Sequence, residues 1–305
     1  MSSIFICGAT GTQGGAIAHH LLKQNINIKT ITRSINSSSA QDLKSHGVTV
    51  TEGDFDNEET LRTALTGCTS VFLNLMPNFL NTEAEHEQAQ RIISIAQASG
   101  VKHIVYSSAL AINDPQRLPH YDPASFFAKA LRSKLAVENQ VRTAGFETWT
   151  ILRPGNFMSN FLLPMAKMYA GLTESGTWTT ALTAETVLPM VDPNDIGQFG
   201  AAVLVDPARF HQQEVEIASQ MMTVDEVLKV LSKVTGKELK ASYMSREEID
   251  AQAPANPLIS AQLAMRDMAM FVDIEEVRKW GLKLGTFEQF LEREADRVAQ
   301  TYSEV

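Results

Sequence analysis

The sequence has little cysteine, a deficit of positive charge and no histidine cluster. Its 305 residues include two cysteines, Cys7 and Cys68, which are too few for a disulfide framework and fit small core positions. Lysine and arginine number 26 against 35 aspartates and glutamates, and they form no basic stripe. Direct binding to nucleic acid is therefore not expected. The seven histidines lack metal-ligand spacing, so we expect no metal.

Long apolar runs are also missing. No stretch reaches the 18 residues of a membrane-spanning helix, and no basic and apolar leader precedes the first predicted strand, which starts at residue 3. We expect no membrane association and a cytoplasmic location, or a nuclear one if the protein is regulatory. Apolar residues make up 44% of the chain and charged residues 20%, which is ordinary for a globular enzyme.

A glycine-rich turn follows the first apolar strand and opens a helix. Gly8, Gly11 and Gly14 lie three residues apart, and each has a physical role. The first allows a tight turn, the second lets the backbone approach a pyrophosphate, and the third lets helix and strand pack closely. The free N–H groups at the start of the helix favour phosphate. We therefore predict dinucleotide contacts from this loop: Gly8, Thr10, Gly11, Thr12, Gln13 and Gly14.

The residues after the second and third strands indicate which dinucleotide binds. Arg33 follows a strand over 28–32, where an NAD-preferring site usually has an acidic residue. Because a guanidinium suits a 2′-phosphate, Arg33 favours NADP(H), although it also fits an exposed surface position. Asp54 and Phe55 follow a strand over 48–51 and are expected beside the adenine. Asp54 fits equally well as a cap of the helix that begins near Asn57.

Strand and helix patterns alternate through the first half of the chain. Strands over 71–73, 103–107 and 148–152 alternate with helices over 82–99 and from about 123 to 143. This alternation predicts an α/β, Rossmann-type, doubly wound parallel sheet. We expect an NADP-binding domain over 1–157, to which 186–205 returns, and a smaller C-terminal α+β substrate lobe over 158–305. Ligands bind at the carboxyl ends of such strands, which adds these expected cofactor contacts: Asn74, Pro154, Asn156 and Phe157.

Four ordered segments carry a family resemblance. They are the glycine loop with Gln13, the helical segment 133–138, the segment 150–161 and the segment 192–197. Together they resemble the NmrA-like family of atypical short-chain dehydrogenases over nearly the whole chain. The resemblance implies an NADP-binding fold. The family includes NADPH-dependent reductases, such as isoflavone-reductase-like and quinone-reductase members, and non-catalytic sensors of the NADP redox state that regulate transcription factors.

The usual catalytic tyrosine of short-chain dehydrogenases is missing. Those enzymes pair a tyrosine with a lysine four residues later. Lys134 is present here, but Ala130 stands at the tyrosine position, and Ala109 stands where an assisting serine is expected. The resemblance to isoflavone-reductase-like proteins implies that Lys134 positions the cofactor or transfers a proton, which makes it the preferred catalytic residue. The weaker catalytic candidates are Tyr121, His120 and Ser108.

Two functions remain open. The first is an NADPH-dependent reductase of a small apolar carbonyl, enone or quinone, because Met158, Met165, Phe157, Phe161 and Trp178 suggest an apolar or aromatic ligand. The same side chains also fit an ordinary core. The second is an NADP(H) redox sensor without turnover, which binds a protein partner such as a transcription factor. Lys134 favours the enzyme, whereas Ala130 and Ala109 favour the sensor.

Overall fold

The computed structural model describes residues 3–76, 81 and 83–305. The chain forms two compact units, each assembled from separate stretches of sequence. The first unit comprises residues 1–109, 130–153 and 196–215. The second comprises residues 110–129, 154–195 and 216–305. The second unit is about as long as the first, and the division predicted between residues 157 and 158 stays a prediction.

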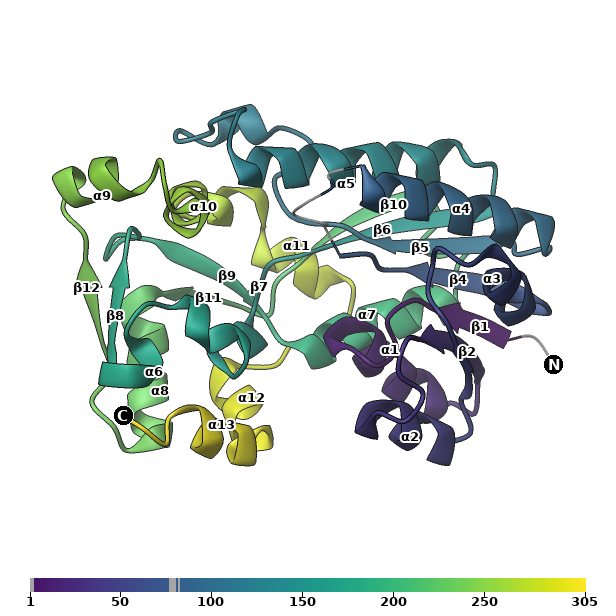
Figure 1. Ribbon diagram of the computed structural model, residues 1–305, viewed down its shortest axis with the longest axis horizontal. Coiled ribbons are helices and arrows are strands. Elements are labelled where there is room, and N and C mark those ends of the chain that lie inside the picture. Colours follow the sequence, from purple (N-terminus) through teal and green to yellow (C-terminus); the bar gives the residue numbers. More distant parts are fainter. Residues whose placement is uncertain (1–2, 77–80, 82) are drawn as a thin grey trace. The chain divides into compact units, whose positions relative to one another are not determined.

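The first unit is built on a seven-stranded sheet with the strand order β10-β6-β5-β4-β1-β2-β3. The pairs β1–β2, β1–β4, β2–β3, β4–β5 and β5–β6 are parallel, as predicted for a doubly wound fold. Helices cover both faces of the sheet, with α4 and α5 on one face and α1 on the other (Figure 1). The elements are β1 (Ser3–Ile6), α1 (Thr12–Leu22), β2 (Asn27–Thr32), α2 (Ser38–Ser45), β3 (Thr49–Glu52), α3 (Glu58–Leu65), β4 (Cys68–Leu73), α4 (Ala84–Ala98), β5 (His103–Ser107), α5 (Phe126–Thr143), β6 (Thr148–Pro154), α7 (Pro193–Val205) and β10 (Gln213–Ile217).

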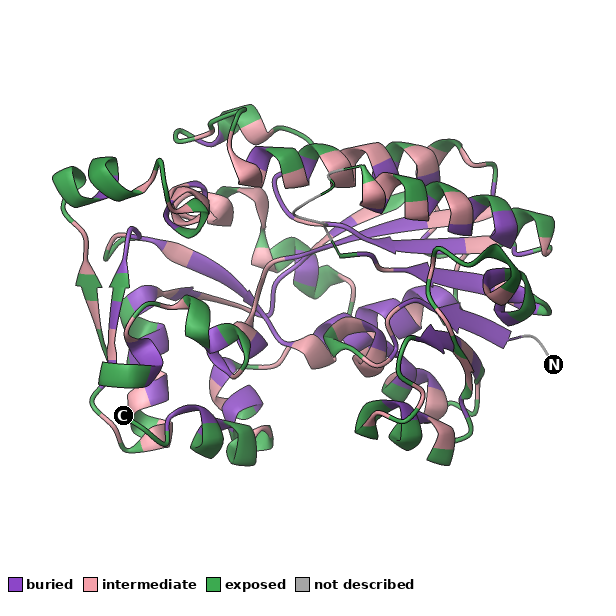
Figure 2. Cartoon of the chain, in the orientation of Figure 1, coloured by how far each residue is buried: buried purple, intermediate pink, exposed green. Residues whose placement is uncertain are grey.

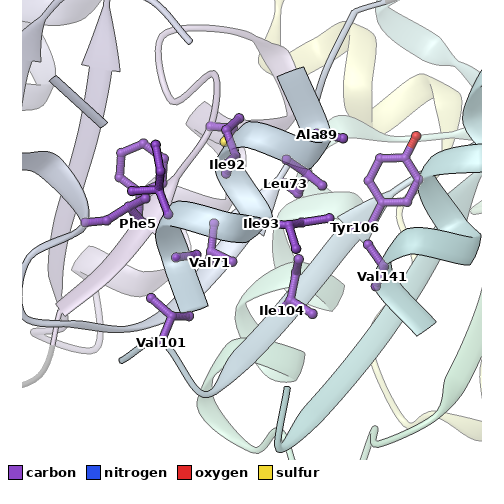
Figure 3. Packing of buried hydrophobic residues seen from close by; sticks show 14 of the residues in the cluster. Phe5, Val71, Leu73, Ala89, Ile92, Ile93, Val101, Ile104, Tyr106 and Val141 are labelled. Carbon is purple, nitrogen blue, oxygen red and sulfur yellow. The ribbon is translucent and has the colours of Figure 1, made fainter. Parts of the chain in front are cut away.

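Alternation along the strands separates the two faces of this sheet. Phe5, Val71, Leu73, Ile104 and Tyr106 share one face, because successive strand side chains point to opposite sides. They pack in one buried cluster against side chains of α3, α4 and α5 (Figure 3). The central strands are buried along most of their length (Figure 2). The cluster therefore fixes α4 and α5 over β4 and β5.

One helix begins later than the sequence predicts. α5 starts at Phe126 rather than near residue 123, because the side chain of Asp122 accepts from the N–H of Ala124 in a turn before the helix. Ser125 then accepts from the N–H of Ala128 in the first turn of α5. α4 starts at Ala84, and its predicted start at residue 82 lies outside the described residues.

The second unit is a mixture of small sheets and short helices. A three-stranded sheet has the order β11-β9-β7, and β8 pairs with β12. Its main core gathers aromatic and aliphatic residues around Trp178 and Phe161. The elements are η1 (Pro115–Arg117), β7 (Asn156–Phe157), η2 (Met158–Phe161), η3 (Met165–Met168), α6 (Leu172–Ser175), β8 (Thr177–Thr180), β9 (Val187–Val191), β11 (Gln220–Thr223), α8 (Val224–Thr235), β12 (Lys240–Tyr243), α9 (Arg246–Gln252), α10 (Pro257–Met265), η4 (Met268–Phe271), α11 (Ile274–Lys279), α12 (Phe287–Arg293) and α13 (Ala295–Thr301).

The cysteines lie in the first unit as free, buried thiols. Burial raises the pKa of Cys7 to about 12 and that of Cys68 to about 11, so both stay protonated and unreactive near neutral pH. Within the described ranges, no helix has the length and apolar character needed to cross a membrane.

Candidate functional site

The glycine loop joins β1 to α1 in the first unit. Gly8 has a φ of +67°, a conformation that glycine adopts without strain, and its carbonyl accepts from the N–H of Gly11 at 2.9 Å. Gly11 occupies the position before α1 and offers no side chain to cap it. The first N–H groups of α1 therefore lack a side-chain acceptor of the kind that usually caps a helix, which makes this helix end suited to an anion.

Gly14 and Gly11 have different structural reasons to be glycine. A Cβ at Gly14 would lie 2.4 Å from the carbonyl oxygen of Gly8, so the close approach of α1 to the loop requires glycine there. A Cβ at Gly11 would meet only that same oxygen, at 3.4 Å. Because the chain itself leaves room at Gly11, a requirement for glycine there has to come from a bound group. This arrangement fits a pyrophosphate against the loop.

Gln13 connects the glycine loop to the ends of two other strands. Its Nε2 donates to Oδ1 of Asn74 after β4, at 3.2 Å, and its Oε1 accepts from the hydroxyl of Ser107 at the end of β5, at 2.7 Å. The side chain of Gln13 thus uses both halves of its amide. This network holds the carboxyl ends of β4 and β5 against the loop, where parallel sheets bind ligands.

Arg33 lies directly after β2, and its side chain is exposed. The guanidinium of Arg33 has no hydrogen-bond or ion-pair partner among residues 3–76, 81 and 83–305. An exposed guanidinium without a protein carboxylate can bind a phosphate with its planar set of donors. Its place fits the predicted contact with a 2′-phosphate.

Asp54 and Phe55 precede α3, and both have roles within the protein. Oδ1 of Asp54 accepts from the N–H groups of Asp56 and Asn57 at 3.0 and 3.1 Å, so it holds the turn that leads into the helix. Asn57, rather than Asp54, caps α3 by accepting from Thr60. Phe55 is half-buried and packs against the core cluster. These contacts give Asp54 and Phe55 roles within the protein itself. The contact of both residues with the adenine stays a prediction.

Lys134 lies on α5 and forms a buried ion pair with Glu85 of α4. Its Nζ donates to Oε1 of Glu85 at 2.8 Å, with the Lys134 side chain 13% exposed and the Glu85 side chain 1% exposed. Oε1 of Glu85 also accepts from the Tyr106 hydroxyl at 3.2 Å, and Oε2 accepts from the Ser133 hydroxyl at 3.0 Å. Three side chains from α5 and β5 therefore meet around the carboxylate of Glu85 on α4, and we call these four residues the Glu85 cluster.

Tyr106 does not replace the missing tyrosine at position 130. Burial and the Glu85 carboxylate raise the pKa of Tyr106 well above its usual range, with a smaller opposing effect from Ser108. A phenol of raised pKa is a poorer proton donor at neutral pH. Ser108 is also buried, and its N–H donates to the carbonyl of Leu152.

The other predicted site residues belong to the second unit. His120 is exposed, whereas Tyr121 packs against a small cluster around Ala111, Leu118 and Ala264. Pro154 ends β6, and β7 places Asn156 and Phe157 beside Met190 and Val191 of β9. A Cβ at Gly155 would lie 2.2 Å from the Pro189 carbonyl oxygen, so this strand pair packs too closely for a larger residue.

The apolar residues expected to line a ligand site divide into core and surface. Met158, Phe161 and Trp178 are fully buried in the core of the second unit, and Tyr169 stacks on Phe161 at 4.8 Å between ring centroids. Met165, by contrast, is 42% exposed. Packing in the core therefore accounts for Met158, Phe161 and Trp178 but not for the exposed Met165. Within the described part of the chain, no group of three or more His, Cys, Asp or Glu side chains is arranged to hold a metal ion.

A model of the NmrA-like family matches residues 1–303. This chain belongs to the NmrA-like family. This NmrA-like protein is 25% identical to an NmrA-like family domain-containing oxidoreductase, ptmS of Penicillium ochrochloron, over 327 residues; the match covers 91% of this chain and 96% of that relative.

Two solved structures share the fold of this NmrA-like protein. The Citrobacter sp. triphenylmethane reductase complexed with NADP(H) is 23% identical with a TM-score of 0.73, over 95% of this chain and 99% of that one. NmrA, a negative transcriptional regulator in complex with NADP, is 14% identical with a TM-score of 0.64, over 99% of this chain and 91% of that one. One neighbour is thus a reductase and the other a regulator.

Sequence reasoning missed Glu85, the residue that organises the surroundings of Lys134. In the sequence, Glu85 is one of several acidic residues at the start of α4 and carries no distinguishing spacing. A weak signal was available, because helical periodicity places Glu85 on the same face as Ala89, Ile92 and Ala96, which form the apolar face of α4. A glutamate on an apolar face needs a buried partner.

Proposed function

We propose that this NmrA-like protein binds NADP(H) and acts as an NADPH-dependent reductase of a small apolar carbonyl, enone or quinone. One observation supports this proposal above the others. The first unit combines a helix N-terminus free of side-chain caps with a lysine ammonium held by a buried carboxylate. The first feature suits the phosphates of a dinucleotide, and the second suits proton chemistry beside it.

The residues proposed to bind the cofactor divide by the group that they contact. The loop from Gly8 to Gly14, including Thr10 and Thr12, would bind the pyrophosphate through N–H groups, and Arg33 would bind the 2′-phosphate. Asp54 and Phe55 would border the adenine. Asn74 and Lys134 would serve the nicotinamide end. Pro154, Asn156 and Phe157, which belong to the second unit, remain predicted cofactor contacts. The bound cofactor supplies the hydride.

Lys134 is the residue proposed to complete the reaction in the absence of a tyrosine at position 130. An ammonium donates hydrogen bonds and stabilises negative charge that develops on a carbonyl oxygen as it accepts a hydride. The ion pair with Glu85 holds the Lys134 ammonium in place for that task. Tyr121, His120 and Ser108 are the weaker candidates for proton donation in this scheme. Ser108 is buried, and Tyr121 packs against an apolar cluster.

The second unit is proposed to supply substrate selectivity. Its exposed apolar side chains suit an apolar or aromatic compound. The likeness to a Citrobacter sp. triphenylmethane reductase, which is described in the bioremediation of triphenylmethane dyes, supports the same substrate class.

The decisive experiment measures NADPH oxidation with quinones, enones, aromatic aldehydes and a triphenylmethane dye. Lys134→Arg, which keeps the charge, is compared with the unmodified chain, and NADPH affinity is measured on both. Turnover that falls at least about 10-fold in the variant, with the cofactor still bound, would support a lysine-dependent reductase. Tight NADPH binding without turnover of any compound would contradict the reductase.

A redox sensor is the second function that a specific observation favours. Ala130 and Ala109 remove two groups of the usual reductase site, and NmrA shares the fold. A sensor has to distinguish the oxidised cofactor from the reduced one, so the affinities for NADP+ and NADPH, or the conformations they stabilise, must differ. Equal affinities and identical hydrogen-exchange patterns with the two cofactors would exclude it.

A further inference from the structure

The Glu85 carboxylate has donors on both oxygens. Tyr106 and Lys134 donate to Oε1, and Ser133 donates to Oε2. Ser133 and Lys134 are consecutive residues of α5, so one turn of that helix holds both oxygens. The carboxylate is therefore fixed in orientation, and its position is set by three secondary-structure elements at once.

Lys134 depends on Glu85 for its position. A lysine side chain has four rotatable bonds, and its ammonium takes a defined place only where an acceptor fixes it. Glu85 is the one carboxylate within 4.0 Å of the Lys134 Nζ among residues 3–76, 81 and 83–305. The ammonium also lies 5.8 Å from the centre of the Tyr106 ring, within the range of a cation–π contact.

The pairing leaves Lys134 able to bind a further group. An ammonium has three N–H donors, and a single bond to Oε1 of Glu85 uses one of them. The described residues supply no second hydrogen-bond acceptor. Hydroxyl or carbonyl oxygens of a ligand are suitable acceptors for the remaining donors.

We propose that Glu85 is a positioning residue, which fixes the ammonium of Lys134 for contact with the cofactor and the reacting oxygen. Glu85 itself touches neither group and acts only through Lys134. This inference rests on the proposed function, because it assigns Lys134 to the cofactor.

A double-mutant cycle on NADPH affinity tests the inference without requiring turnover. The four proteins are the unmodified chain, Glu85→Gln, Lys134→Ala and the double variant. Glu85→Gln should raise the Kd for NADPH about 10-fold, the size of a lost charge-assisted hydrogen bond. In the Lys134→Ala background the same change should alter the Kd by less than about 2-fold. A merely structural role would give the same factor in both backgrounds.

Matched variants keep the test interpretable. Glu87→Gln removes one charge from the exposed side of the same helix and should leave the Kd unchanged. Glu85→Asp keeps the charge but shortens the side chain, so it should raise the Kd by less than Glu85→Gln does and serves if the glutamine variant does not fold. An unchanged Kd in both Glu85 variants, or equal factors in the two backgrounds, would overturn the inference.

The result of the binding cycle can be distinguished from a failure of the proposed reductase function. Turnover of the acceptor panel by the unmodified chain is measured beside the binding cycle. A non-additive cycle without turnover would contradict the reductase and leave the role of Glu85 standing. Turnover with an additive cycle would support the reductase and contradict the role of Glu85.

Discussion

Two buried glutamates of the first unit are satisfied in different ways. Glu138, which is fully buried, accepts from the Arg153 guanidinium through both oxygens at 3.0 and 2.8 Å and also from Arg142. Both arginines bind Glu214 as well. Glu85 accepts from one ammonium and two hydroxyls. The first network consists of rigid, multiply bonded guanidinium pairs, and the second contains a lysine with donors to spare.

We propose that this difference separates a structural network from one that serves a ligand. Glu138 and Lys134 lie four residues apart on α5, so they share one face of the helix. Arginine binds carboxylates with a planar fork and suits a permanent link between α5, β6 and β10, whereas lysine is a compact charge that can serve a ligand. The predictions below test this division, beginning with the largest expected effect.

Removing Arg153 should cost the most stability. Arg153→Met leaves the buried Glu138 with less compensation for its charge, and we expect a loss of about 3 kcal/mol in the free energy of unfolding. Urea denaturation measures it. Arg62→Met, which breaks an exposed pair with Glu58, is the control and should cost less than about 1 kcal/mol. Equal losses of unfolding free energy in Arg153→Met and Arg62→Met would show that the buried ion pairs of Glu138 stabilise the fold no more than an exposed pair does.

Lys134→Ala should also lower stability, by roughly 2 to 3 kcal/mol, because it leaves Glu85 buried without a cation. Adding Glu85→Gln should restore part of that loss, since a neutral amide costs less to bury than an uncompensated carboxylate. Thermal unfolding of the single and double variants measures the recovery. A double variant less stable than Lys134→Ala alone would contradict the proposed balance of charge.

The glycine loop should show the same division between structure and ligand binding. Gly14→Ala forces a Cβ against the Gly8 backbone and should destabilise the fold by roughly 2 kcal/mol. Gly11→Ala should change stability by less than about 1 kcal/mol but weaken NADPH binding. Calorimetry of unfolding and of NADPH titration separates the two effects. NADPH binding that survives Gly11→Ala unchanged would mean that no phosphate approaches this position.

Arg33→Ala should change binding and leave stability alone. The side chain is exposed and lacks a partner among the described residues, so its loss should weaken NADPH binding roughly 10-fold while NADH binding stays the same. Only NADPH carries the 2′-phosphate. Fluorescence titration with both cofactors tests this, and equal losses would remove Arg33 as the basis of cofactor preference.

The smallest effect concerns acid stability. Burial alone raises the pKa of Glu214, but Arg153 and Arg142 outweigh it, and the net pKa lies below its ordinary value. The carboxylate therefore stabilises the fold above the ordinary glutamate pKa of about 4.3, and this contribution is lost as the pH falls through the lowered pKa. Glu214→Gln should lower stability at pH 7 by roughly 0.5 kcal/mol and flatten the loss in acid. Denaturation between pH 3 and 7 checks both.

Local patterns predicted the sheet and the glycine loop, because each depends on residues close together in the sequence. The apolar run before Gly8, the spacing to Gly14 and the glycines at helix ends act locally. The predicted parallel sheet and family were confirmed. The contacts of the cofactor residues remain predictions.

The sequence did not predict the buried ion pairs, because their members come from distant segments of the chain. Glu85 meets Lys134 across 49 positions, and Glu138 meets Arg153 only once α5 and β6 are packed together. Glu138 and Arg153 stood in two of the segments that carried the family resemblance, yet nothing in their spacing indicated that they bind each other. Long-range pairing of this kind follows from the tertiary fold and not from local propensity.

The side chain of Gln13 takes its two partners from Asn74 and Ser107, the second of them 94 positions further along the chain. During synthesis Gln13 leaves the ribosome 94 residues before Ser107 does. It cannot gain these contacts until the strand that ends at Ser107 has also emerged. The loop is thus translated before the residue that completes its support, and a nascent chain that stops before that strand carries the glycine motif without both contacts of Gln13.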